Sequence, residues 1–154
     1  MVLLKSILHN IGVLFVGFIF AFIGVVMDSV LKITDFRTFL ALIIGCFLLA
    51  IGFLIRVWAT FYFYKKNMSV IRLEPQKELF TSGPYGFSRN PLYLGGNVFI
   101  FLGAVLFLGS PSGVVLTVFA IMATDFMIRR EEKQLAQDFG QRWINYKSNV
   151  RRWI

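Results

Sequence analysis

The fold of this chain is constrained above all by long apolar runs, which occupy roughly residues 11–30, 39–64, 94–108 and 114–128. A helix needs about 20 apolar residues to cross a hydrocarbon core about 30 Å thick. Soluble domains carry about a quarter charged residues, whereas this chain has 16% and is 57% hydrophobic. The sequence therefore predicts an all-α integral membrane protein with four transmembrane helices in a single domain over residues 1–154.

The basic residues are placed unevenly along the chain, which has a net charge of +8. Most Lys and Arg residues fall in the loop at residues 65–93 and in the tail at residues 129–154. Cytoplasmic flanks of membrane helices have this composition, and such flanks attract anionic lipid headgroups. We therefore expect a multi-pass protein with both termini in the cytoplasm and with membrane lipids, not nucleic acid, as partners. The oligomeric state stays open.

Charged residues also lie within the apolar runs: Arg56 in the second, Asp125 in the fourth, and Asp28 near the end of the first. A charge near the bilayer centre costs about 2.5–3.5 kcal/mol on insertion scales, and less near an interface. Asp125 can pair with Arg129 one helical turn further on. Arg56 is expected to act either as a structural anchor or as a residue of a functional pocket.

Glycines and metal-ligating residues give no sign of a nucleotide or metal site. Gly95, Gly96 and Gly103 in the third run follow no dinucleotide or phosphate-loop pattern, so we interpret them as small residues for close helix packing. His9 and Cys46 are each the sole residue of their type. A metal site normally needs three or four ligands, so the sequence predicts no metal.

The stretch TSGPYGFSRNPLYLG at residues 81–95 differs from its apolar surroundings. Its prolines restrict the backbone, and Pro91 suits the first turn of a following helix. Its rings and planar cation come from Tyr85, Phe87, Arg89 and Tyr93. These groups suit a small ligand with aromatic and charged parts. An interfacial aromatic belt with a helix cap is the alternative.

The tail contains a second polar signal. Leu135, Phe139 and Trp143 recur every four residues, which predicts an amphipathic C-terminal helix that lies on the membrane or packs on the bundle. Glu131 and Glu132 stand at its start, close to the predicted membrane surface. These adjacent carboxylates are either solvated surface charges or part of a site shared with the loop.

Two motifs together resemble those of the isoprenylcysteine carboxyl methyltransferase family and the related phospholipid N-methyltransferases. They are T-S-G-P-Y-x-x-x-R-N-P-x-Y-x-G in the loop and E-E-x-x-L-x-x-x-F-G-x-x-W-x-x-Y in the tail. The resemblance covers residues 77–153. It implies S-adenosylmethionine as cofactor and a lipophilic or prenylated acceptor that enters from the bilayer. The cofactor contacts that it implies are Lys77, Glu78, Leu79, Phe80, Tyr85, Asn90, Pro91, Leu92, Tyr93 and Glu131.

Simple chemistry adds further candidates to this implied site. Arg89 suits the carboxylate of the cofactor. The candidate catalytic residues are Glu132, Arg129 and Asp125. Of these, Glu132 or Asp125 would act as the base if the acceptor were an amine, because a carboxylate acceptor needs none.

Two departures from the family pattern leave the acceptor open. Many relatives have His where this chain has Asn90, and eukaryotic relatives have a substrate-contacting Arg where it has Met127. Phospholipid N-methylation and a noncatalytic membrane scaffold are the alternatives. All enzymatic readings require that the loop and the tail, represented by Tyr93 and Glu131, meet around one ligand.

Overall fold

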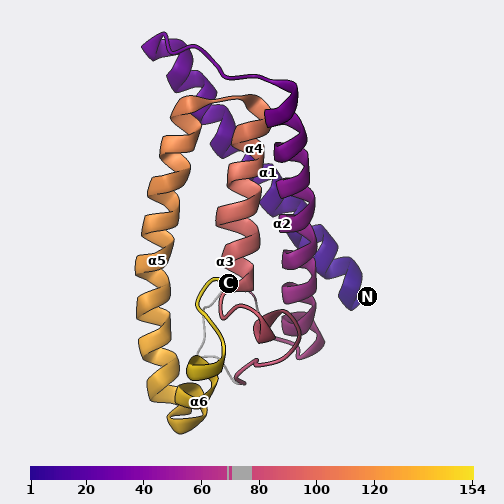
Figure 1. Ribbon diagram of the computed structural model, residues 1–154. Coiled ribbons are helices and arrows are strands. Elements are labelled where there is room, and N and C mark those ends of the chain that lie inside the picture. Colours follow the sequence, from indigo (N-terminus) through magenta and orange to yellow (C-terminus); the bar gives the residue numbers. More distant parts are fainter. Residues whose placement is uncertain (69, 71–77) are drawn as a thin grey trace.

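The computed structural model describes residues 1–68, 70 and 78–154. Within these residues every regular element is a helix. Figure 1 shows the long helices side by side, with the loop, the short last helix and the C-terminus toward one end. The elements are α1 (Val2–Leu31), α2 (Phe39–Lys65), η1 (Gly83–Gly86), α3 (Pro91–Tyr93), the π-helical segment η2 (Leu94–Ile100), α4 (Phe101–Leu108), α5 (Pro111–Phe139) and α6 (Gln141–Asn149).

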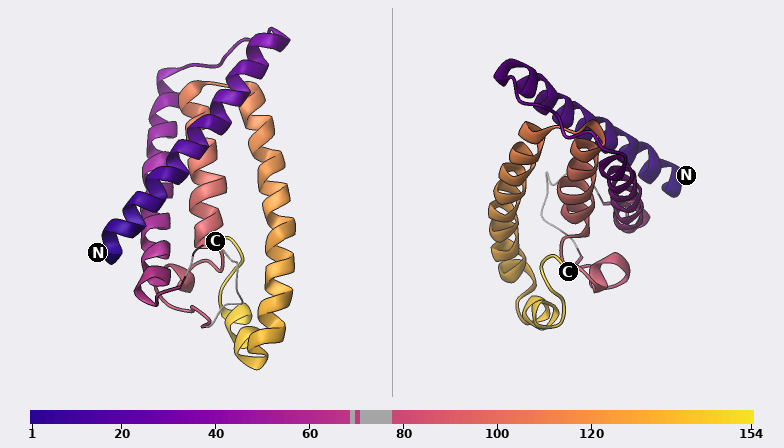
Figure 2. Two further views of the ribbon diagram at one scale, coloured as in Figure 1. Left: turned by 180° about the vertical axis from the view of Figure 1, so that it is seen from behind. Right: turned by 45° about the horizontal axis from the view of Figure 1, so that its top comes forward.

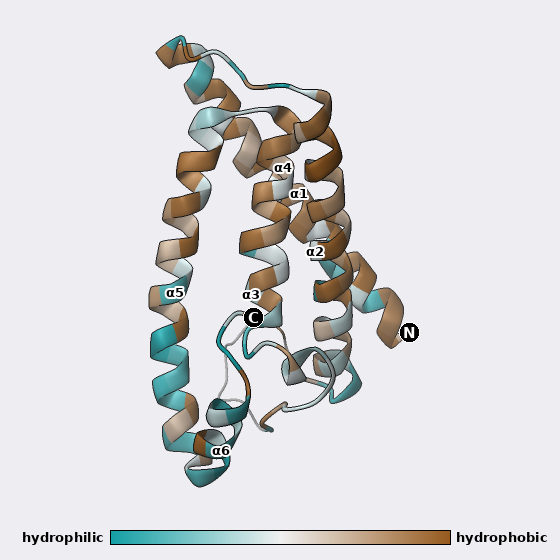
Figure 3. Cartoon of the chain, in the orientation of Figure 1, coloured by the Kyte–Doolittle hydropathy of each residue, from teal (hydrophilic) through white to brown (hydrophobic). Residues whose placement is uncertain are grey.

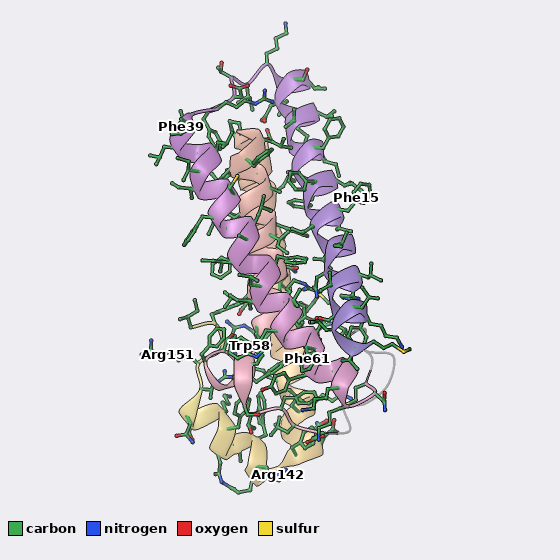
Figure 4. All side chains as sticks on the ribbon, turned by 90° about the vertical axis from the view of Figure 1, so that its right-hand side faces the viewer. Phe15, Phe39, Trp58, Phe61, Arg142 and Arg151 are labelled. Carbon is green, nitrogen blue, oxygen red and sulfur yellow. The ribbon has the colours of Figure 1, made fainter. Side chains whose placement is uncertain are left out.

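Four helical segments are long and apolar enough to cross a membrane, which confirms the predicted fold class. They are α1, α2, the continuous segment Pro91–Leu108 and α5. Large apolar side chains cover their outer faces, as Figure 4 shows for Phe15 and Phe39, which are 68% and 80% exposed. Such surfaces are stable where the surrounding solvent is lipid. The side of the membrane on which α6 lies stays a prediction.

The last long helix extends further than the predicted span. Helix α5 continues past Ile128 and ends only before Gly140, which has a φ of 50°. No glycine or proline intervenes, so the backbone has no local reason to stop earlier. The predicted amphipathic stripe is therefore divided between α5, which carries Leu135, and α6, which carries Trp143. These side chains pack with Leu79 of the loop. Figure 3 shows that the lower part of α5 and α6 are mostly hydrophilic, whereas the upper part of α5 is mostly hydrophobic.

One buried carboxylate joins α1 to the start of α5. Asp28 accepts hydrogen bonds from the Ser110 hydroxyl at 2.5 Å and from the Ser112 backbone N–H at 2.9 Å. Ser110 is itself the N-cap of α5 and accepts from the Gly113 N–H at 3.0 Å. This contact supplies acceptors for N–H groups that a helix start leaves without partners.

Glycines bring the helices close together, as predicted for the third run. A Cβ on Gly95 would come within 2.7 Å of the Gly52 carbonyl oxygen, and one on Gly103 within 2.9 Å of the Gly45 carbonyl oxygen. Only glycine allows α2 to approach η2 and α4 so closely. On the other side α1 crosses α5 near the far end, and Figure 2 shows the two helices diverging toward the end that holds the loop.

Candidate active site

The loop is anchored on the end of α2 by a tight turn and an aromatic cluster. Gly83 has a φ of 61°, and a Cβ there would lie 2.3 Å from the Tyr62 hydroxyl oxygen, so this turn requires glycine. Tyr85, in η1, packs with Phe63 and Phe80 in a buried cluster. Residues 80–85 of the loop are therefore fixed against the end of α2.

Arg89 joins the loop to the tail. Its Nε and Nη2 donate to Glu132 Oε1 at 3.1 and 2.9 Å. Its Nη1 donates to the carbonyl oxygens of Val150 at 2.7 Å and Lys147 at 3.0 Å. The guanidinium carbon also lies 5.8 Å from the centre of the Trp143 ring. Although Arg89 was predicted to bind the cofactor, most of its donors bind the tail.

The three predicted catalytic residues belong to a cluster of ion pairs. Arg152 Nη2 donates to Glu132 Oε2 at 2.7 Å, and Arg152 Nη1 donates to Asp125 Oδ1 at 3.3 Å. Arg129 pairs with Asp125 at 2.7 Å, as predicted. The hydrogen bond to Glu132 raises the pKa of Arg152 further above its usual range. Through Arg152, the cluster holds the segment after α6 to α5. The catalytic role of Asp125, Arg129 and Glu132 stays a prediction.

The backbone and Tyr146 complete the junction between the loop and the tail. The Arg89 N–H donates to the Arg151 carbonyl oxygen at 3.0 Å, and Asn90 Nδ2 donates to the Arg152 carbonyl oxygen at 3.1 Å. The Tyr146 hydroxyl donates to the Tyr85 carbonyl oxygen at 2.7 Å. Burial raises the pKa of this hydroxyl, which keeps it a donor. Segments far apart in sequence thus form one unit.

A cavity of about 550 Å³ lies between the loop, the tail and the helices. The Tyr93 hydroxyl donates to Glu131 Oε1 at 2.8 Å, and both residues line this cavity. Loop and tail therefore meet at one cavity, and the prediction that this cavity encloses one ligand stays a prediction. The predicted cofactor residues in its wall are Leu79, Phe80, Tyr85, Arg89, Asn90, Pro91, Leu92, Tyr93 and Glu131.

The remaining predicted site residues have other positions. Lys77 lies outside the described residues. Glu78 pairs with Lys66 at 3.1 Å. Among the residues that the structure describes, the cavity wall does not include Glu78 or the predicted catalytic residues Asp125, Arg129 and Glu132.

The cavity also has a polar wall within the membrane spans. It is formed by His9 of α1, Arg56 of α2 and Asn97 of η2. Asn97 Nδ2 donates to the Thr124 hydroxyl on α5 at 2.6 Å. His9 and Asn97 were not predicted as site residues, because His9 was considered only as a metal ligand. The signal that could have identified them is a polar side chain within an apolar helix.

Arg56 proves to be both an anchor and a cavity residue. Its Nε donates to Asn10 Oδ1 at 2.8 Å, and its Nη1 donates to the Leu92 carbonyl oxygen at 2.7 Å. Its Nη2 lies 3.5 Å from His9 Nε2. The residue is 8% exposed, and no described carboxylate forms an ion pair with it. The cavity therefore contains a buried positive charge whose partners among the described residues are neutral or aromatic groups.

Comparison with known proteins identifies the family. A family model described as phospholipid methyltransferase matches residues 40–142, which is more than half of the chain. No curated protein and no solved structure matches it. The matched range includes the loop, Glu131 and the third span, and it confirms the resemblance that the two motifs indicated. The chain therefore belongs to the phospholipid methyltransferase family and is a membrane methyltransferase.

Proposed function

We propose that this protein transfers a methyl group from S-adenosylmethionine to a carboxylate on a lipophilic acceptor, as the resemblance to isoprenylcysteine carboxyl methyltransferases implies. One observation carries the proposal. A single cavity combines the aromatic loop, the Glu131 carboxylate of the tail and the buried Arg56 within the spans. Its wall thus has groups for a polar cofactor at one side and for an anionic acceptor at the other.

The cofactor fits the residues present. Ligand sites occupy about 300–1,000 Å³, and this cavity measures about 550 Å³. Glu131 offers a carboxylate for an ammonium group, and the Phe80 and Tyr85 rings offer surfaces for adenine or for a positive sulfur. These side chains therefore match a ligand that has an ammonium group, a positively charged sulfur and a planar base.

The protein contributes binding, orientation and exclusion of water. When bound, S-adenosylmethionine supplies a methyl group that is already activated by the positive charge on sulfur. The chain must then hold the acceptor oxygen in line with this group, which saves most of the entropic cost of the encounter. The loop and tail, joined by Arg89, line one side of the cavity, and we expect them to limit the access of water to a bound cofactor.

Arg56 favours an anionic acceptor. A buried guanidinium attracts a carboxylate and repels an ammonium, and this effect is strong where the surroundings are apolar. A carboxylate also needs no base before it attacks. This agrees with the positions of Glu132 and Asp125, which pair with arginines and are not among the described residues of the cavity wall. Met127 lines the cavity and is 54% exposed on α5, so we propose that lipophilic acceptors enter from the bilayer beside it.

The second candidate acceptor is a phosphatidylethanolamine-type amine. The description of the matching family favours it. Its ammonium must lose a proton before attack, and the bases predicted for that step lie outside the cavity wall. We therefore rank it below a carboxylate. A noncatalytic scaffold is disfavoured by the family match.

The test measures transfer of a labelled methyl group by purified protein in lipid nanodiscs. Prenylcysteine analogues and phosphatidylethanolamine are offered separately with labelled S-adenosylmethionine. We expect label in the prenylcysteine analogue. Label in phosphatidylethanolamine alone would establish the second candidate, and label in neither, with intact cofactor binding, would reject both acceptor classes.

Cofactor binding is tested separately by calorimetric titration of S-adenosylhomocysteine into detergent-solubilised protein. We expect saturable binding that Tyr85→Ala and Glu131→Ala weaken. Glu78→Ala is the matched control, because it removes the same charge outside the cavity wall. No heat from the wild-type protein would contradict the cofactor assignment and favour the scaffold.

A further inference from the structure

A second hollow, of about 620 Å³, lies between the end of α5 and α6. We call it the basic hollow, because the charged side chains in its lining, among the described residues, are five basic groups and one carboxylate. These are Arg129, Arg130, Lys133, Lys147, Arg152 and Glu132. It is separate from the cavity described above, although Trp143 lines both.

The positive charge of the basic hollow exceeds its negative charge. Glu132 is shared between Arg152 and Arg89, and Arg129 pairs with Asp125. Within the part of the chain that the structure describes, no carboxylate forms an ion pair with Arg130, Lys133 or Lys147. Three cations around one space repel each other, and an anion between them would lower this repulsion.

An apolar surface leads into the basic hollow. Phe126 lines it, and the Arg130 guanidinium carbon lies 4.4 Å from the centre of the Phe126 ring. Phe119 and Met122 precede Phe126 at helical spacing, and all three are exposed. The hollow thus lies where the apolar run of α5 ends, at the level expected for lipid headgroups.

We propose that the basic hollow binds the phosphate of an anionic phospholipid, whose acyl chain lies along Phe119, Met122 and Phe126. Basic side chains bind phosphate through charge-assisted hydrogen bonds. The adjoining apolar surface selects an amphiphile over a free phosphate ion. This site is independent of the proposed methyl acceptor, because among the residues that the structure describes its lining includes neither a loop residue nor Arg56.

The experiment counts bound lipid on the full-length protein by native mass spectrometry during titration with phosphatidylglycerol. The test variant is Lys133→Ala/Lys147→Ala. The control is Arg142→Ala/Arg151→Ala, which removes the same charge from the same end of the molecule, as Figure 4 shows, but leaves the hollow intact. We expect the test variant to lose affinity about thirtyfold, since each basic side chain near an anionic surface contributes a factor of about five. The control variant retains wild-type affinity.

Three further arms decide the outcome. Lys133→Arg/Lys147→Arg keeps the charge and must keep the binding, which shows that a loss in the alanine variant reflects charge and not misfolding. Phosphatidylcholine and inorganic phosphate must bind much more weakly than phosphatidylglycerol. Equal losses in the test and control variants, or equal binding of inorganic phosphate, would overturn the proposal.

Discussion

Two charged groups are buried at opposite ends of the bundle, and they have different surroundings. Asp28 is 5% exposed and Arg56 is 8% exposed. Asp28 accepts hydrogen bonds on both carboxylate oxygens, from Ser110 and Ser112 at the start of α5. Arg56 donates to Asn10 and to the Leu92 carbonyl oxygen, and it borders a cavity.

The difference separates a structural charge from one available to a ligand. A charge within a membrane protein is costly and needs compensating groups nearby. For Asp28 these groups come from the start of α5, so the charge holds α1 against α5. For Arg56 the described protein supplies dipoles without an ion pair, so an anionic ligand can complete the site.

The largest effect is expected from Arg56→Leu, which removes the charge from the cavity. We expect KM for a prenylcysteine analogue to rise about a hundredfold, because truncating one partner of a buried charged contact costs about 2–5 kcal/mol. The fall in kcat should be smaller, since the acceptor loses negative charge as its bond to the methyl carbon forms. Steady-state kinetics in nanodiscs measures both constants.

Arg56→Lys is the matched variant for this comparison. It retains the charge but not the planar geometry of guanidinium, so partial recovery of KM is expected. S-adenosylhomocysteine affinity should stay near wild type in both variants. A purely structural Arg56 would instead show equal losses of cofactor affinity, acceptor affinity and thermal stability.

A smaller effect, on stability alone, is expected for Asp28→Ala. The change removes the acceptor for Ser110 and Ser112, which should lower the free energy of unfolding by about 2 kcal/mol. Unfolding in a denaturing detergent measures this change. Methyl transfer by the folded fraction should be unaltered, and a large loss of kcat at unchanged stability would break the contrast between the two ends.

Glu131→Gln sharpens the comparison at the loop end. Charge-assisted hydrogen bonds contribute about 1.5–3 kcal/mol, so the affinity for S-adenosylhomocysteine should fall about tenfold or more. The amide oxygen can still accept from the Tyr93 hydroxyl, which keeps the local contact. Calorimetry measures the affinity, and an unchanged value would remove Glu131 from the cofactor site.

Much of this architecture could be predicted from local sequence features. Apolar runs of sufficient length identify four spans, and antiparallel helices bring the loop and the tail to the same end. The family resemblance of the two motifs implied that Tyr93 and Glu131 face one site, and the two side chains do meet. The spans and the meeting of the two segments at one end depend on residues close in sequence or on simple connectivity.

The partners of individual charged groups were harder to predict. Arg89 binds carbonyl oxygens of Lys147 and Val150 and so holds the tail, a role that depends on the path of the chain after Gly140. His9 and Asn10 are recognisable only when α1 is extended to begin at Val2, which places them beside Arg56. Hydrogen bonds between different elements depend on tertiary packing, which cannot be inferred from the local patterns of a single sequence.

The smallest effect is expected at Glu78, which the family resemblance includes among the cofactor contacts. Its carboxylate pairs with Lys66 at 3.1 Å, and both side chains are about half exposed. Exposed ion pairs contribute about 0.2–1 kcal/mol, and Glu78 is outside the cavity wall among the described residues. Glu78→Gln should therefore leave S-adenosylhomocysteine affinity within about twofold, as measured by the same calorimetry. A loss equal to that of Glu131→Gln would instead mean that Glu78 moves to the cofactor when the cofactor binds. Glu78 would then belong to the cofactor site, as the family resemblance implies.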